Sequence, residues 1–205
     1  EQEAAIDYLT TNIRPNKDQA FVVSFDNEPQ MLQDYTDDVE KLARGIRSLQ
    51  AGGGTGLYEA IYFSAKEKMI FFPPPEPYLR RVMIIISDGE DNQSARSREE
   101  ALAMAQRGEV TVFAISTNRT GAARPGDKVL KRLAEETGGQ AFFPFAASDL
   151  SGDFRQIARE LRSQYSLAYI STNKAQDGTF RAITVLPRLR VKGAAMSGGR
   201  LGIFE

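Results

Sequence analysis

The sequence predicts an α/β fold: a doubly wound, mostly parallel sheet flanked by helices. From residue 1 to residue 164, short apolar segments rich in β-forming residues alternate with amphipathic helical segments. One of these segments, RVMIIIS at 81–87, is a continuous aliphatic run, which is typical of a parallel strand covered on both faces. Folds of this class bind ligands in the crevice at the carboxyl ends of their strands, so the loops that follow strands are the places to look for function.

Each expected element follows from its local pattern. Short runs of β-forming residues predict strands at 19–26, 30–36, 81–87, 110–117 and 140–145. Apolar residues with helical spacing predict helices at 3–13, 38–49, 57–71, 97–108, 128–139 and 149–164. Asp37 and Asp38 are candidate caps for the second helix, Gly108 ends the fourth, and PPPEP at 73–77 stops the third.

The pattern changes after residue 164. YSLAYIST at 165–172 and TFRAITVLPRLRV at 179–191 are strand-like, and the DG dipeptide at 177–178 is a hairpin-turn signal. We therefore expect one domain over residues 1–164 and a C-terminal β-hairpin extension over 165–205, packed on the same domain.

Composition excludes several classes of site. With 26 basic and 27 acidic residues, nothing favours a nucleic-acid partner. The chain has no cysteine and no histidine, which rules out disulfides, triads that use histidine, and zinc sites of the usual type. A metal held by this chain must therefore be bound by oxygen. The longest aliphatic run, VMIII at 82–86, is too short to span a membrane, and the absence of a starting methionine indicates a piece of a longer protein.

Asp88 is the first candidate site residue. It comes directly after the predicted strand at 81–87, so its carboxylate is expected at the mouth of the crevice, where it could bind a metal. The simpler interpretation is that Asp88 and Gly89 form a turn. The oxygens of Glu90, Asp91 and Asn92 follow, and for these a solvated acidic turn is the favoured interpretation.

Thr55 is the second candidate, inside the glycine-rich stretch GGGTG at 52–56. This stretch lacks the glycine spacing of a dinucleotide fingerprint and the lysine of a phosphate loop, and it follows a predicted helix instead of a strand. A flexible linker remains possible. So does a role for Thr55 as the N-cap of the next helix.

Taken together, GGGTGLYEAI and a hydrophobic strand ending in ISDGEDN resemble the von Willebrand factor type A (VWA) domain. More narrowly, the chain is similar to VWA-related proteins found often in acidobacteria, which share a C-terminal extension like YSLAYISTNKAQDGTFRAITV. The resemblance covers nearly the whole chain, and the two motifs in this order are fairly specific.

The resemblance implies a protein-binding, adhesion-type module with a metal-ion-dependent adhesion site (MIDAS). In that family three loops hold the metal, and Thr55 and Asp88 match the residues of the second and third loops. The metal is usually Mg²⁺, with Ca²⁺ or Mn²⁺ as alternatives, and an acidic side chain of a protein partner completes its shell. By the same resemblance, the protein is expected outside the cytoplasm: secreted, periplasmic or on the cell surface.

The chain departs from the family pattern in its first loop. The Asp-x-Ser-x-Ser motif is absent, and the nearest candidate, SFDNE at 24–28, follows a different strand. The resemblance thus implies an N-terminal truncation that removes the central strand from the 1–164 domain. With two of the five usual ligand positions present, this chain is expected to bind Mg²⁺ weakly or not at all.

Two other functions remain open from the sequence. One is a metal-free structural scaffold with a decayed site. The other is a Mg²⁺-dependent phosphohydrolase that uses Asp88, because DGE at 88–90 is similar to the Asp-x-Asp of haloacid-dehalogenase-like phosphatases. That motif requires a second aspartate, where this chain has Glu90, and no supporting lysine motif is evident. The sequence therefore predicts a binding module with no catalytic residue.

Overall fold

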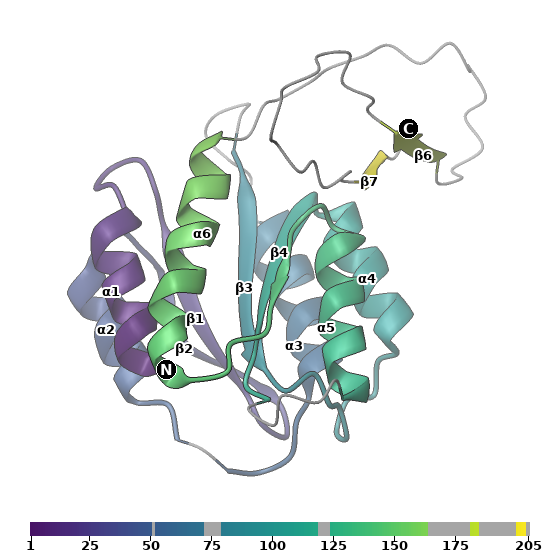
Figure 1. Cartoon of the computed structure of the whole chain (residues 1–205), viewed down its shortest axis with the longest axis horizontal. Helices are drawn as coiled ribbons and strands as arrows, with labels where there is room; N and C mark the ends of the chain where they lie inside the picture. The colour runs from purple at the N-terminus through teal and green to yellow at the C-terminus, as the bar shows by residue number, and fades with distance from the viewer. Residues whose placement is uncertain (51, 72–78, 119–123, 164–180, 185–199, 204–205) are drawn as a thin grey trace.

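A computed structural model describes residues 1–50, 52–71, 79–118, 124–163, 181–184 and 200–203. Helices lie on both faces of the strands (Figure 1), as the doubly wound α/β prediction requires. The strands are β1 (Ala20–Phe25), β2 (Pro29–Thr36), β3 (Arg81–Ser87), β4 (Val110–Ser116), β5 (Ala141–Phe142), β6 (Arg181–Thr184) and β7 (Arg200–Ile203).

The strands form three separate ladders. Strands β3, β4 and β5 are parallel neighbours in that order, with Ile85 opposite Ala114 near the centre. Strands β1 and β2 form an antiparallel pair, and β6 pairs with β7 in the same antiparallel manner. A parallel ladder with helical crossovers is what the continuous aliphatic pattern at 81–87 predicts.

The helices begin and end close to their predicted positions. They are α1 (Gln2–Asn12), α2 (Val39–Arg47), α3 (Leu57–Phe63), α4 (Arg98–Arg107), α5 (Pro125–Glu135) and α6 (Leu150–Ser163). The Asp38 carboxylate caps α2 by accepting from the amides of Glu40 and Lys41, and Gly108 is the C-cap of α4. These local signals are visible in the sequence, which explains the agreement.

Two helices differ from the prediction. The segment expected as one helix over 57–71 is α3 followed by a π-helical stretch, Ser64–Ile70. Helix α5 begins at Pro125, three residues before the predicted start at residue 128. Proline suits the first turn of a helix, and the Asp127 carboxylate accepts a hydrogen bond from the Arg124 amide at 2.9 Å, which secures this earlier start.

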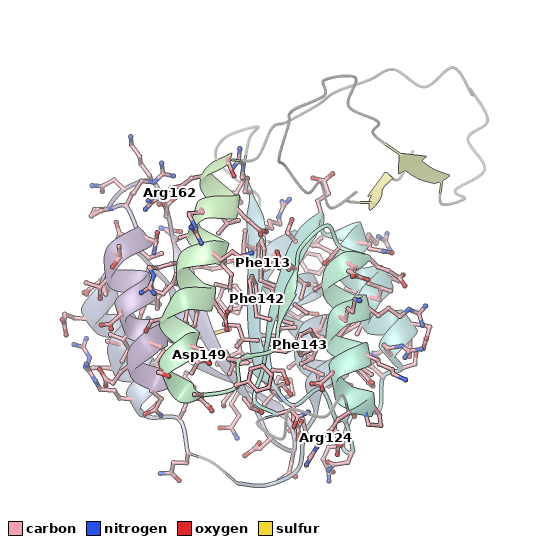
Figure 2. All side chains as sticks on the ribbon, in the orientation of Figure 1. Phe113, Arg124, Phe142, Phe143, Asp149 and Arg162 are labelled. Atoms are coloured by element: carbon pink, nitrogen blue, oxygen red, sulfur yellow. The ribbon has the colours of Figure 1, made fainter. Side chains whose placement is uncertain are left out.

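The core has a cluster on each face of the parallel sheet. One cluster joins α3, α4 and α5 to β3 and β4, with Leu57, Ile61, Leu102 and Leu130 fully or nearly fully buried. The other joins α6 to the opposite face. Figure 2 shows Phe113 and Phe142 on the strands beside α6.

The β1–β2 pair and the parallel ladder are not hydrogen-bonded to each other, although the same helices cover both. On one face, Val22 of β1 packs against the cluster that contains Ile6 of α1, and Ile84 of β3 packs against a second cluster that Tyr8 of α1 also contacts. On the other face, Phe25 of β1 packs against the cluster that contains Leu57 of α3 and Ile85 of β3. The junction between the two ladders therefore lies between α1 and α3.

The C-terminal segment is described only in part. The predicted strand at 165–172 lies outside the described residues, whereas β6 falls inside the predicted strand at 179–191. The partner of β6 is β7, for which the sequence offered no expectation. A hairpin extension packed on the domain stays a prediction. Among the described helices, none has the length and apolar character needed to cross a membrane.

Candidate metal site at the carboxyl edge of the sheet

Three loops meet at the carboxyl ends of β1 and β3. Asp26 follows β1, Thr55 precedes α3, and Asp88 follows β3. The Gly56 amide donates to the Asp26 carbonyl at 2.7 Å, which joins the first two loops. The structure thus brings the glycine-rich stretch to the strand ends, where a ligand of this fold class is expected.

The loop after Asp88 holds both backbone groups of Thr55. The Thr55 amide donates to Oδ1 of Asn92 at 2.9 Å, and the Thr55 carbonyl accepts from the amides of Asn92 and Gln93 at 3.0 and 3.2 Å. The second and third loops are therefore tied together by a reciprocal set of hydrogen bonds. A flexible linker would not have this arrangement.

The first turn of α3 is capped by side chains from the same distant loop. Its N-cap is Gly56, which has no side chain, so the prediction that Thr55 caps this helix is wrong. Instead, the Tyr58 amide donates to Oδ2 of Asp91 and the Glu59 amide to Oγ of Ser94, each at 2.9 Å. Asp91 and Asn92 therefore have structural partners, in contrast to the solvated acidic turn that the sequence favoured.

Gly53 shows why the Thr55 loop is rich in glycine. Its φ of +81° is a conformation that side-chain-bearing residues rarely adopt, and a Cβ there would lie 2.9 Å from the Cβ of Asp26. The next amide, that of Gly54, donates to Oδ1 of Asn27 at 3.2 Å. The glycines let this loop pack closely on the loop that follows β1.

Asp88 is held by its neighbours in a tight turn. Its Oδ1 accepts from the Glu90 amide at 3.1 Å, and the Gly89 amide donates to Oγ of Ser87 at 3.1 Å. Gly89 has a φ of +78°, and a Cβ there would collide with the Gly126 carbonyl. The turn predicted at 88–89 is thus confirmed, and it also fixes the direction of the aspartate.

Among the described residues, each of the two candidate ligands, Thr55 and Asp88, keeps one oxygen without a hydrogen bond. In the described part of the chain, neither the Thr55 hydroxyl nor Oδ2 of Asp88 forms a hydrogen bond, and both residues are partly exposed. Mg²⁺ and Ca²⁺ prefer oxygen ligands, and a carboxylate and a neutral hydroxyl both supply them.

Asp127 is a buried carboxylate behind the Asp88 turn that the sequence analysis missed. It accepts from the Ser116 hydroxyl at 2.7 Å and from the Asn118 side-chain amide at 2.9 Å, besides the Arg124 amide. Burial alone would raise the pKa of Asp127, but these hydrogen bonds outweigh burial and hold the pKa below its usual value. The segment PGD at 125–127, a proline followed two residues later by an acid, was the available signal.

The residues present fit only part of a metal site. Mg²⁺ requires about six oxygen ligands, several of which can be water. Thr55 and Asp88 offer two. Asp26 resembles Asp88 in that its Oδ1 accepts from a neighbouring amide, that of Asn27 at 2.6 Å, so it could offer at most one more oxygen. No group of three or more acidic side chains that could hold a metal exists among the residues that the structure describes.

Comparisons with known proteins agree on the fold. A crystal structure of the protein BatB from Bacteroides thetaiotaomicron is 16% identical with a TM-score of 0.58, and the match covers 79% of this chain and 87% of that one. The von Willebrand factor domain of Mfa5, a type V pilus tip protein of Porphyromonas gingivalis, is 15% identical with a TM-score of 0.63, covering 83% and 88% of the two chains.

A third similar structure is proximal thread matrix protein 1 of the mussel byssus, described with a zinc-occupied MIDAS motif. It is 19% identical with a TM-score of 0.62, and the match covers 77% of this chain but 41% of the mussel protein. No curated protein sequence matches the chain. The family model for the von Willebrand factor type A domain matches residues 3–160, which is most of the chain. The chain therefore belongs to the von Willebrand factor type A domain family.

Proposed function

We propose that this chain is a protein-interaction module in which Thr55 and Asp88 supply two oxygen ligands to a divalent cation. The observation that carries the proposal is the pair of uncommitted oxygens on two loops that are hydrogen-bonded to each other. Mg²⁺ is the favoured ion, with Ca²⁺ and Mn²⁺ as alternatives, because each accepts hard oxygen donors and retains water. No catalytic role is assigned to either residue.

The remaining protein ligands would come from a segment that joins the two ladders. We place an extended strand between β1 and β3, ending in an Asp-x-Ser-x-Ser loop beside Thr55 and Asp88. Two observations support this placement. Residues of both β1 and β3 pack into the cluster that contains α3, and the aliphatic residues Val82, Ile84 and Ile86 of β3 stay only partly buried. The central residues of β4, by contrast, are fully buried.

The proposed ligand of the module is a protein with an exposed acidic side chain. A carboxylate oxygen from the partner would take a coordination position otherwise held by water, which links binding to the presence of the metal. An extracytoplasmic location belongs to the same proposal. It is supported by the names of similar structures, which include a pilus tip protein and a membrane protein related to aerotolerance.

Calorimetric titration with Mg²⁺ and Mn²⁺ tests the proposal. The titrated proteins are this chain, and this chain preceded by any residues that its gene encodes immediately before Glu1. The longer protein is expected to bind the ions. Asp88→Ala is expected to reduce the affinity at least tenfold, because even residues that only orient a metal ligand change the affinity by about that factor. Asp7→Ala, which removes an exposed carboxylate on α1, is the matched control.

Each possible result of the titration has a clear meaning. Equal affinities for the Asp88→Ala variant and the unaltered protein would exclude Asp88 as a ligand. No binding by the longer protein, together with preserved folding, would establish the metal-free scaffold instead. Hydrolysis of a generic phosphate ester that Asp88→Ala abolishes would turn the interpretation toward a phosphohydrolase.

A further inference from the structure

We propose that Asn92 is a positioning residue for the metal site, which ties Thr55 to the Asp88 loop before a cation arrives. The proposal rests on the function proposed above and adds a residue that the ligand pattern does not include. Asn92 would not touch the metal. It would act through Thr55, whose backbone it holds on both sides.

The geometry is a closed pair of hydrogen bonds. Oδ1 of Asn92 accepts from the Thr55 amide at 2.9 Å, and the Asn92 amide donates to the Thr55 carbonyl at 3.0 Å. Since Asn92 follows Asp88 by four residues in a loop anchored at the end of β3, the pair fixes Thr55 relative to the strand that places Asp88. Both candidate ligands are thereby held in position by the same element, the carboxyl end of β3.

Neighbouring residues hold a different part of the second loop. Asp91 and Ser94 bind the amides of Tyr58 and Glu59, so they fix the start of α3 and not the threonine itself. The loop before Thr55 is made of glycines, which have large backbone freedom, and Asn27 restrains it at Gly54, one residue before Thr55. Among the described residues, Asn92 supplies the side chain that bonds to the backbone of Thr55 itself.

The expected benefit lies in the affinity for the cation. A ligand that is already ordered loses less conformational entropy when it binds a metal, and this raises affinity without any new contact. Asn92 is exposed, so its side chain adds little to the packing of the core. Its loss is therefore expected to weaken metal binding far more than it lowers the melting temperature.

The test compares Asn92→Ala and Asn92→Asp with Gln30→Ala, which removes an exposed amide side chain on β2. All variants are made in the longer protein used for the titration above. Two quantities are measured: amide hydrogen exchange of Thr55 without metal, and the affinity for Mn²⁺ by calorimetry. Asn92→Ala is expected to speed exchange at Thr55 and to weaken Mn²⁺ binding about tenfold, in the range seen for residues that orient metal ligands. Asn92→Asp keeps the acceptor oxygen, so it should restore slow exchange at Thr55 and the affinity for Mn²⁺.

The two measurements separate this proposal from the one on which it rests. Unchanged exchange at Thr55 in Asn92→Ala would overturn the positioning role whatever the metal does. Faster exchange with unchanged Mn²⁺ affinity would overturn it as well. Absence of Mn²⁺ binding in the unaltered longer protein would overturn the proposed function, and with it any role in metal binding, while the exchange data still report on the hydrogen bond. A large fall in melting temperature for Asn92→Ala would mark a structural residue.

Discussion

Asp127 illustrates how a single side chain can stabilise the loops behind a candidate site. It is only 8% exposed, and it accepts hydrogen bonds from three donors on β4, the following loop and the residue before α5. Beside it, the backbone of Gly126 lies against the Asp88 carbonyl so closely that a Cβ on Gly126 would collide with it. Asp127 thus stabilises the start of α5, which packs directly against the Asp88 turn.

Replacing Asp127 by asparagine should make the protein less stable and less sensitive to acid. Because hydrogen bonding holds its pKa below the usual value, the ionised form adds stability that is present above about pH 4 and is lost as the pH falls through the folded-state pKa. We expect Asp127→Asn to lower the free energy of unfolding at pH 7 by about 1–3 kcal/mol. Urea unfolding at pH 7, 5 and 3 measures both effects.

Asp7→Asn is the control, because the Asp7 carboxylate is exposed on α1. The control should keep the stability of the unaltered protein and its loss in acid. If Asp127→Asn loses as much stability between pH 5 and pH 3 as the unaltered protein, the hydrogen bonds to Asp127 are not the source of its pH dependence.

At this scale the sequence identifies residue types better than their partners. Thr55 and Asp88 stand out because they match a known order of motifs, although their role as metal ligands stays a prediction. Asn92 and Asp127 do not stand out, because an asparagine or aspartate in a polar loop is common. Their importance comes from hydrogen bonds to residues 37 and 11 positions away, which no local pattern contains.

At the scale of elements, helix starts follow from sequence when the cap is local. Ser97 and Glu100 form a capping box at α4, within four consecutive residues. Helix α3 lacks such a signal, since Ser94 reaches it from 35 residues further along the chain. The sequence accordingly predicts where α4 starts, whereas for α3 it predicts the position and the wrong capping residue.

The two kinds of cap lead to a paired prediction. Ser97→Ala and Ser94→Ala should each lower the free energy of unfolding by about 1 kcal/mol, the usual value of a helix cap. Only Ser94→Ala should speed amide exchange at Glu59, because only that variant removes the acceptor for this amide. Exchange measured residue by residue by NMR distinguishes them. Equal effects of both variants at Glu59 would mean that the distant cap is not used in solution.

At the scale of the whole molecule, helix α1 joins the two ladders. Ile6 is 6% exposed and packs with Ala43 and Ile46 of α2, while Tyr8 stacks on Phe154 of α6 with ring centroids 5.1 Å apart. Through α2 and α6, this one helix is in contact with both sides of the junction.

Ile6→Ala should therefore destabilise the molecule as a unit. Removing a buried isoleucine side chain costs about 2–5 kcal/mol, so a lower melting temperature is expected by circular dichroism. Amide exchange should become faster in β1 as well as in β3, because residues of both strands pack into the clusters that residues of α1 contact. Asp7→Ala, at the next and exposed position, should leave both measurements unchanged. An effect confined to β1 would show that α1 does not couple the two ladders.

The fold class was predictable from the sequence, but the pairing of strands was not. Alternation of apolar strands and amphipathic helices is a local property, and it predicts a doubly wound fold correctly. Pairing joins residues far apart, and here β1 pairs only with β2, and β3 only with β4, among the described strands. The partner of β6 was missed for the same reason, because β7 lies in a glycine-rich segment without a strand-like pattern.

The distant capping of α3 also bears on the order of folding. The carboxylate of Asp91 and the hydroxyl of Ser94 must close chain segments of 33 and 35 residues to reach their amides. Closing such a segment has an entropic cost that a local cap does not have. The first turn of α3 therefore becomes secure only after β3 and the loop beyond it have docked. Interactions that form after the transition state change the unfolding rate more than the folding rate. These caps are therefore expected mainly to slow unfolding.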